Sequence, residues 1–185
     1  MSNGLQGLNL YLVGMMGVGK TTIGKVLAEK FHYRFVDTDD VIVQATGKSI
    51  NEIFRQDGEA AFRSVEKNVL AQVSTYTQMV VATGGGIVMY QENWSYMHYG
   101  LIIWLDAPVE LLIQRLAEDT SRPLLQDTNP EAKLRSLLQQ RQPMYAQADL
   151  HIPISSQETP TQIADKILTQ IPSVLKSTDN RESLN

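Results

Sequence analysis

Short apolar runs alternate along the chain with segments in which apolar residues recur at helical spacing. Strands that alternate with helices indicate an α/β fold. Strands buried on both faces read as continuous apolar runs, so we expect a three-layer fold, in which helices cover both faces of a five-stranded, mostly parallel sheet. The candidate strands are Leu8–Val13, Arg34–Val36, Met79–Ala82, Leu101–Leu105 and Leu150–Ile154.

Polar residues and prolines mark where several helices begin and end. Two pairs of residues have the spacing of a capping box, one of them followed by a proline at the first helical position. These pairs are Ser49 with Glu52, and Thr159 with Gln162, which flank Pro160. A helix over Pro130–Arg141 should end near Gln142, because Pro143 follows and disfavours helical geometry in the residue before it.

The length and composition indicate one domain with a core over about residues 8–172. With 185 residues and 43% hydrophobic content, the chain has enough apolar surface for one core but no room for a second large domain. Glu118–Asn129 is polar without a helical period, and we expect a mobile loop or lid over about 117–129. Ser173–Asn185 lacks an apolar face, so we expect it to be disordered.

Charge and cysteine content narrow the classes of partner. A net charge of −4 and a pI near 5.4 argue against a nucleic-acid partner, which normally needs a clustered basic surface. The absence of cysteine excludes disulfides and thiolate metal sites, and it fits a reducing compartment. No signal peptide or membrane-spanning run is visible, so we expect a cytoplasmic protein without a membrane partner.

A glycine-rich motif follows the first candidate strand. Residues 14–21 read GMMGVGKT and match G-x-x-x-x-G-K-[ST], the phosphate-binding P-loop. Glycines let the backbone curl so that successive N–H groups and the helix N-terminus converge on a phosphate. Lys20 would neutralise the β- and γ-phosphate oxygens, and the Thr21 hydroxyl would ligate Mg²⁺. The alternative is a glycine turn beside a solvated lysine.

Two aspartates follow the second candidate strand. Asp37 and Asp39 would project from the carboxyl end of the sheet, where ligands gather in open parallel sheets. Their spacing would let one serve the metal and the other a hydroxyl group. The alternative is that Asp39 or Asp40 caps a helix over Val41–Ala45.

Asp106 is another candidate for the metal carboxylate, because it ends the apolar run LIIWLD. Pro108 lies two residues later and suits the start of a helix, so we favour Asp106 as a helix N-cap. The chain has no N-K-x-D-like motif for reading guanine, which weakens the case for a GTPase.

Several further residues could bind anions. Arg63 and Glu66 lie three apart on one predicted helix face, where they can orient each other, although a solvated ion pair is the commoner reason for this spacing. Three glycines at 84–86 follow a buried strand and could offer N–H groups to a ligand, or form a flexible turn. Arginines near a nucleotide site can stabilise charge on a transferring phosphoryl group. The candidates of this kind are Arg115, Arg122 and Arg141.

Taken together and in order, these motifs resemble those of shikimate kinases, which are P-loop kinases of the nucleoside-monophosphate-kinase-like group. The resemblance covers about Leu8 to Ile171. It rests on the motifs GMMGVGKT, DTD, Gly58-Glu59 with Phe62-Arg63 and Glu66, TGGG, RPLL and R-x-P-x-Y.

The resemblance implies Mg-ATP-dependent phosphorylation of the 3-hydroxyl of shikimate, in the pathway to chorismate and aromatic amino acids. It implies that Lys20, Asp39 and Arg122 act in catalysis, with Arg122 in the lid. The ATP-binding residues would be Gly17, Val18, Gly19, Lys20, Thr21, Thr22, Arg115, Arg122 and Gln157. Thr21 and Asp37 would hold Mg²⁺. A segment over about 38–66 would bind shikimate, with the substrate contacts Asp39, Arg63, Gly85 and Arg141. Phe54 and Phe62 would wall the ring, and Glu66 would hold Arg63.

Two other functions stay open. A different small-molecule kinase, such as a gluconate kinase, would share the P-loop and the sheet but not the paired carboxylate-binding arginines. A nucleotide-binding regulatory module would bind ATP without turning over a hydroxylated carboxylate. No apolar stripe demands a partner chain, so we expect a monomer.

Overall fold

The protein folds around one parallel sheet. The computed structural model describes residues 5, 7–117 and 129–182. Its five strands lie in the order β2-β3-β1-β4-β5, and all neighbours are parallel. They are β1 (Leu10–Val13), β2 (Arg34–Asp37), β3 (Met79–Ala82), β4 (Leu101–Asp106) and β5 (Leu150–Pro153). The predicted α/β fold with a parallel five-stranded sheet is confirmed.

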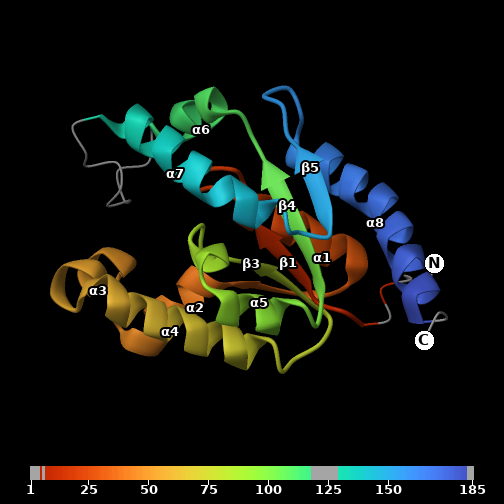
Figure 1. Ribbon diagram of the computed structural model, residues 1–185, viewed down its shortest axis with the longest axis horizontal. Helices are drawn as coiled ribbons and strands as arrows, with labels where there is room; N and C mark the ends of the chain where they lie inside the picture. Colours follow the sequence, from red (N-terminus) through yellow and green to blue (C-terminus); the bar gives the residue numbers. More distant parts are fainter. Residues whose placement is uncertain (1–4, 6, 118–128, 183–185) are drawn as a thin grey trace.

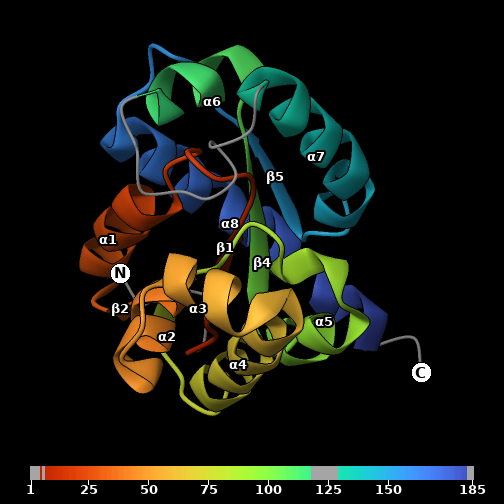
Figure 2. The ribbon, with the colours of Figure 1, turned by 90° about the vertical axis from the view of Figure 1, so that its left-hand side faces the viewer.

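Helices lie around the sheet on both faces (Figures 1 and 2). α1 and α8 pack against each other on one side of the sheet, while α4, α5 and α7 lie on the other. The helices are α1 (Lys20–Phe31), α2 (Thr38–Thr46), α3 (Ile50–Gln56), α4 (Gly58–Val73), the 3₁₀-helix η1 (Ile87–Met89), α5 (Gln91–Met97), α6 (Val109–Leu116), α7 (Pro130–Tyr145) and α8 (Pro160–Glu182).

In the described part of the chain, no helix has both the length and the apolar composition needed to cross a bilayer.

The central strand β1 fixes where the functional groups meet. All four residues of β1 are buried, and Leu10 aligns with Val80 of β3 and with Leu101 of β4. Because the strands are parallel, their carboxyl ends lie at one edge of the sheet. The P-loop after β1, Asp37 at the end of β2, and the triglycine after β3 therefore come together there.

Both predicted capping boxes are present. The Glu52 N–H donates to Ser49 Oγ at 3.2 Å, and the Ser49 N–H donates to Glu52 Oε2 at 2.8 Å. The Gln162 N–H donates to Thr159 Oγ1 at 3.2 Å, and the Thr159 N–H donates back to the Gln162 side chain at 2.9 Å. These bonds satisfy N–H groups that a helix start otherwise leaves without partners.

The predicted end of the helix over Pro130–Arg141 is wrong. α7 continues through Pro143 to Tyr145. Pro143 has no N–H for the carbonyl of Gln139, but Gln139 is exposed, so water can satisfy that carbonyl. Tyr145 is fully buried, and this burial favours the additional turn.

The predicted disorder from Ser173 onward is also wrong for residues 173–182, because α8 runs on to Glu182. Val174 and Leu175 pack against the core, an apolar contact that the prediction of disorder did not include. Residues 183–185 lie outside the described part of the chain.

Candidate active site

The P-loop has the backbone geometry that its glycines predicted. Gly17 has a φ of 78° and Gly19 a φ of 105°, a region that residues with a Cβ rarely adopt. The Lys20 ammonium donates to the carbonyl oxygens of Gly14 at 2.7 Å and Met15 at 2.9 Å. Lys20 is therefore held over the loop by the loop itself, which argues against the alternative of a solvated lysine.

Thr21 and Asp37 form a pair of oxygen ligands beside the loop. The Thr21 hydroxyl donates to Asp37 Oδ2 at 2.7 Å. Hydroxyl and carboxylate oxygens are the ligands that Mg²⁺ prefers, usually completed by water and substrate phosphates. The donor set therefore fits Mg²⁺ bound together with a nucleotide. Among the described residues, no cluster of three or more His, Cys, Asp or Glu side chains offers a metal centre made by protein alone.

Asp37, and not Asp39 or Asp40, caps the helix that follows. α2 begins at Thr38, and Asp37 Oδ1 accepts a hydrogen bond from the Asp39 N–H at 3.0 Å. The alternative capping role for Asp39 or Asp40 is thus wrong, because the helix begins three residues earlier than expected. Asp39 lies in the first turn of α2, and its side chain lines two neighbouring cavities.

The nucleotide side of the site is a cavity of about 370 Å³. The P-loop residues Gly17 to Thr22 line it together with Asp37 and Arg115. Arg115 donates to the carbonyl oxygens of Val18 at 2.9 Å and Gly17 at 3.3 Å, so it buttresses the loop.

The residues between β5 and the first turns of α8 that line this cavity are not the one that was predicted. Gln157 is not among the lining residues, whereas Glu158, Pro160 and Ile163 are. The Glu158 carboxylate accepts from the Ser155 N–H at 2.8 Å, which tightens this turn. The loose spacing of the segment could not fix which residue faces inward.

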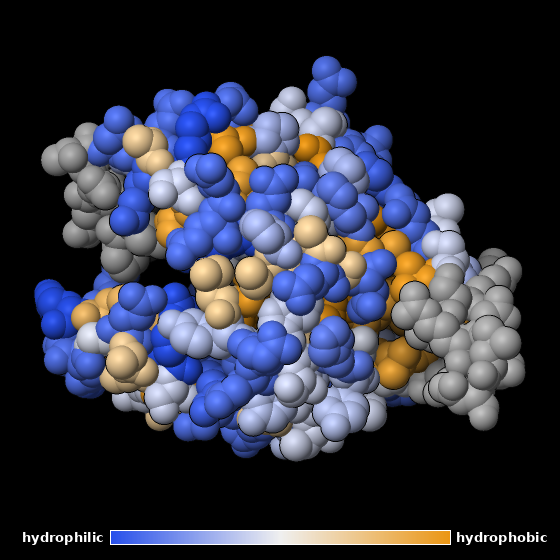
Figure 3. All heavy atoms as spheres, in the orientation of Figure 1, coloured by the Kyte–Doolittle hydropathy of each residue, from blue (hydrophilic) through white to orange (hydrophobic). Residues whose placement is uncertain are grey.

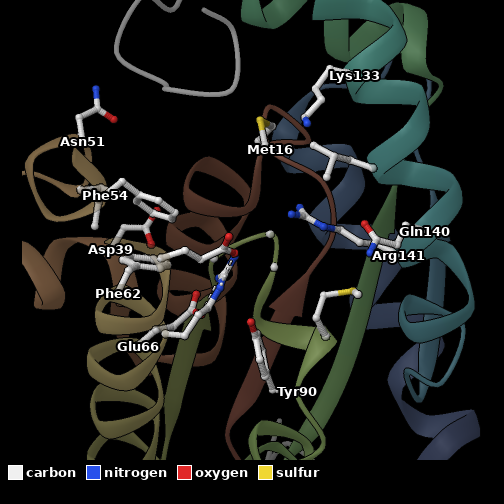
Figure 4. A pocket seen from close by; sticks show the side chains of 18 residues that line it. Met16, Asp39, Asn51, Phe54, Phe62, Glu66, Tyr90, Lys133, Gln140 and Arg141 are labelled. Atoms are coloured by element: carbon white, nitrogen blue, oxygen red, sulfur yellow. Dashed lines mark hydrogen bonds and ion pairs between the residues drawn. The ribbon is translucent and has the colours of Figure 1, made fainter. Parts of the chain in front are cut away.

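A second cavity of about 560 Å³ opens beside the first, and Asp39, Gly84 and Gly85 line both. The surface is hollowed between α3 and α7 (Figure 3). The Phe54 and Phe62 rings, 4.6 Å apart between centroids, form an apolar wall, and Arg141 projects into the cavity from the opposite side (Figure 4). The arrangement suits a small ring that carries a negative charge.

Arg63 is held by carboxylates of its own helix. Its Nη1 donates to Glu66 Oε2 at 2.8 Å and its Nη2 to Glu59 Oε1 at 3.0 Å. Glu66 is only 1% exposed, so this is not the solvated pair that the spacing alone would favour. Burial raises the pKa of Glu66 above its ordinary value, and the charge of Arg63 opposes that rise.

Arg141 is a buried charge that no salt bridge within the described part of the chain neutralises. It is 7% exposed, its Nε is buried without a hydrogen-bond partner, and it forms no ion pair with any described residue. A Cβ on Gly85 would lie 3.2 Å from its Nη1, so the guanidinium rests against the triglycine. A buried cation that forms no direct ion pair is costly, and the nearby Glu66 carboxylate offsets only part of that cost. This position is therefore suited to an anionic ligand.

Asp106 does not cap a helix. α6 begins at Val109 with Pro108 at its N-cap, and no side chain caps it. Asp106 ends β4, where its Oδ2 lies 2.8 Å from His151 Nε2, and the His151 ring stacks on Trp104 at 4.0 Å. Pro108 has an extended backbone, with a ψ of 144°, so α6 begins only at Val109. The Asp106 carboxylate pairs with His151 of β5 instead.

Arg122 and most of the predicted lid, residues 118–128, lie outside the described part of the chain. The other residues expected at the site come together at one edge of the sheet, apart from Gln157. Tyr145 was overlooked, although it belongs to R-x-P-x-Y and lies one helical turn beyond Arg141.

Comparison with known proteins decides the family. The family model described as shikimate kinase matches residues 16–172. The chain belongs to the shikimate kinase family. A shikimate kinase of Nostoc sp. strain PCC 7120 is 64% identical over 178 residues, which covers 96% of this chain and 98% of the relative.

Solved structures of shikimate kinases agree with this assignment. The shikimate kinase from Acinetobacter baumannii in complex with shikimate is 42% identical, with a TM-score of 0.87, covering 91% of this chain and 95% of that one. The shikimate kinase from Bacteroides thetaiotaomicron is 31% identical, with a TM-score of 0.81, covering 91% of this chain and 98% of that one. Membership of the family supports ATP as co-substrate with Mg²⁺.

Proposed function

We propose that this protein transfers the γ-phosphoryl group of Mg-ATP to the 3-hydroxyl of shikimate. The observation that carries the proposal is the pairing of the two cavities. One is lined by the P-loop, the other holds Arg63 and Arg141, and Asp39 lies on the boundary between them. A phosphoryl donor and an anionic hydroxylated acceptor can thus meet beside one carboxylate.

On the nucleotide side, we assign the P-loop N–H groups and Lys20 to the phosphates. Thr21 and Asp37 would hold Mg²⁺, whose charge stabilises the negative charge on the phosphate oxygens when it is bound. Arg115 supports the loop through its bonds to the Val18 and Gly17 carbonyls, and we keep its predicted role in binding ATP as part of the proposal. The roles predicted for Gln157 and Arg122 stay predictions.

On the acceptor side, Arg141 and Arg63 would bind the shikimate carboxylate together with the Gly85 N–H. Glu66 keeps the fork of Arg63 in place through the 2.8 Å ion pair. Phe54 and Phe62 would pack against the ring. Two planar guanidinium groups fix a carboxylate in direction as well as in position, which suits a reaction that depends on in-line alignment.

Asp39 would accept a hydrogen bond from the reacting hydroxyl. Phosphoryl transfer passes through a loose transition state, so the proton need not leave early. We therefore expect Asp39 to act through placement of the hydroxyl as well as through proton removal. Its position at the start of α2, next to the Asp37 cap, keeps it on rigid backbone.

We also propose that the protein works as a cytoplasmic monomer. The absence of cysteine and the net charge of −4 support a small-molecule enzyme without a nucleic-acid partner.

The test is a coupled ADP-release assay with Mg-ATP and shikimate, run beside gluconate and a blank without acceptor. Arg63→Ala should raise the KM for shikimate by about 10- to 100-fold, since a charge-assisted hydrogen bond contributes roughly 1.5–3 kcal/mol. Arg135→Ala is the matched control, because Arg135 is an exposed arginine paired with Glu110 and Glu131 on the surface. ADP release that is equal without shikimate, or that requires gluconate, would show that the acceptor is wrong.

A further inference from the structure

The buried tyrosine at the end of α7 connects the two halves of the site. Tyr145 is 0% exposed, and its phenol O–H donates to the Gly85 carbonyl oxygen at 2.6 Å. The phenol oxygen also lies 3.7 Å from the sulfur of Met15, in the P-loop. One side chain thus touches the loop that faces the nucleotide and the triglycine that faces the acceptor.

The unexpected length of α7 is what brings Tyr145 to this place. Arg141 and Tyr145 are four residues apart, so they lie on the same face of a continuous helix. Both side chains stay on this face only because α7 continues through Pro143. Pro143 has no N–H, so the helix lacks one backbone hydrogen bond there. A helix that ended at Gln142 would not hold both side chains against the triglycine.

The triglycine needs such restraints because it has little rigidity of its own. Glycine backbone is conformationally free, and three in a row would sample many orientations. The Gly84 N–H donates to Thr38 Oγ1 at 3.2 Å, and the Gly84 carbonyl accepts from the Ile87 N–H at 3.2 Å. Tyr145 adds the restraint on the Gly85 carbonyl. Among the described residues, these bonds leave the Gly85 N–H available for a ligand.

The Tyr145 phenol remains a hydrogen-bond donor at every pH near neutrality. Burial raises the pKa of Tyr145 to about 12, and the nearby charge of Arg141 only partly opposes that rise. The proton therefore stays on the oxygen, and the hydrogen bond to the Gly85 carbonyl persists.

We propose that Tyr145 is a positioning residue for the acceptor carboxylate. It fixes the Gly85 backbone so that the Gly85 N–H points at the carboxylate beside the Arg141 guanidinium. This inference rests on the proposed function, because it presumes that a carboxylate binds between Arg141 and Gly85.

The test is Tyr145→Phe, which removes one hydroxyl and keeps the ring. We expect the KM for shikimate to rise about 3- to 10-fold, the effect of one hydrogen bond. The kcat and the KM for Mg-ATP should stay within about twofold of wild type, because Met15, the P-loop residue that the phenol contacts, does not line the nucleotide cavity. Tyr11→Phe is the matched control, because Tyr11 of β1 is equally buried and lines neither cavity. Its hydroxyl accepts a 3.4 Å hydrogen bond from the Asn9 side chain.

The possible outcomes separate this inference from the proposed function. An unchanged KM for shikimate in an active Tyr145→Phe enzyme would overturn the positioning role alone. So would a parallel loss in kcat and in both KM values, because that pattern reports general damage to the fold. A wild-type enzyme without shikimate-dependent turnover would overturn the proposed function together with this inference.

Discussion

Replacing Arg141 by methionine should separate stability from function. Arg141 is buried and has no carboxylate partner among the described residues, so the free protein bears the cost of desolvating its charge. Methionine is unbranched, flexible and uncharged, and it can fill much of the space that the Arg141 side chain occupies. The substitution should therefore stabilise the free protein and weaken binding of the acceptor at the same time.

The two effects differ in size. Burying one ion costs several kcal/mol in proteins, and the nearby Glu66 carboxylate offsets part of that cost. We expect a net gain of about 1–2 kcal/mol in the free energy of unfolding, or a rise in Tm of roughly 2–8 °C for a chain of this length. Loss of two charge-assisted bonds to the carboxylate should cost about 3 kcal/mol or more, which raises the KM for shikimate by about 100-fold.

Thermal unfolding with and without shikimate measures both effects. Wild type should have the lower Tm alone and gain about 2.7 kcal/mol of stability when shikimate is at 100 times its Kd. Arg141→Met should have the higher Tm alone and respond little to the same concentration. Arg135→Met removes an exposed arginine of the same helix and should change neither. A variant that melts below wild type and still responds fully to shikimate would show that the Arg141 charge neither destabilises the free protein nor binds the acceptor.

Three further substitutions test other parts of the site and fold. Burial raises the pKa of Glu66, so its contribution to stability is greatest below its ordinary value of 4.5 and is lost as pH rises through the folded pKa. Glu66→Gln should flatten this decline in urea unfolding across pH, and parallel profiles for both proteins would contradict it. Thr21→Val should lower kcat/KM for Mg-ATP by about 100-fold or more, because the variant has no hydroxyl to ligate the metal. Thr21→Ser should keep most of kcat/KM, and equal losses in the two variants would argue against a metal-binding role for Thr21. Ser49→Ala should lower the free energy of unfolding by about 1 kcal/mol without changing kcat, since it removes a helix cap whose own side chain lines neither cavity. A changed kcat would show that the cap also acts on the reacting groups.

Local patterns predicted the parts of the molecule whose geometry is itself local. The P-loop glycines, the capping box at Ser49 and the strand Met79–Ala82 each depend on a few neighbouring residues, and the structure has them as expected. The ion pair between Arg63 and Glu66 also follows from helical spacing. Its burial does not, because that depends on the helices and the triglycine packed around it.

Long-range packing decided the features that local patterns missed. Pro143 stays within α7 because Tyr145 is anchored on Gly85, which is 60 residues away in sequence. Asp106 turns to His151 on the neighbouring strand, a pairing that depends on the order of strands in the sheet. α8 extends past Ser173 because two later apolar residues reach the core. None of these contacts has a signature within a short stretch of sequence.

The central place of β1 in the sheet has a consequence for biosynthesis. β1 leaves the ribosome before the other strands, yet Leu10 pairs with Val80 on one side and Leu101 on the other. At about 5–20 residues per second, the first of these partners is synthesised roughly 4 to 14 seconds later. An apolar strand and an unsupported P-loop must wait that long without their neighbours. Nascent chains of this protein should therefore present a binding site for chaperones until β3 and β4 have emerged.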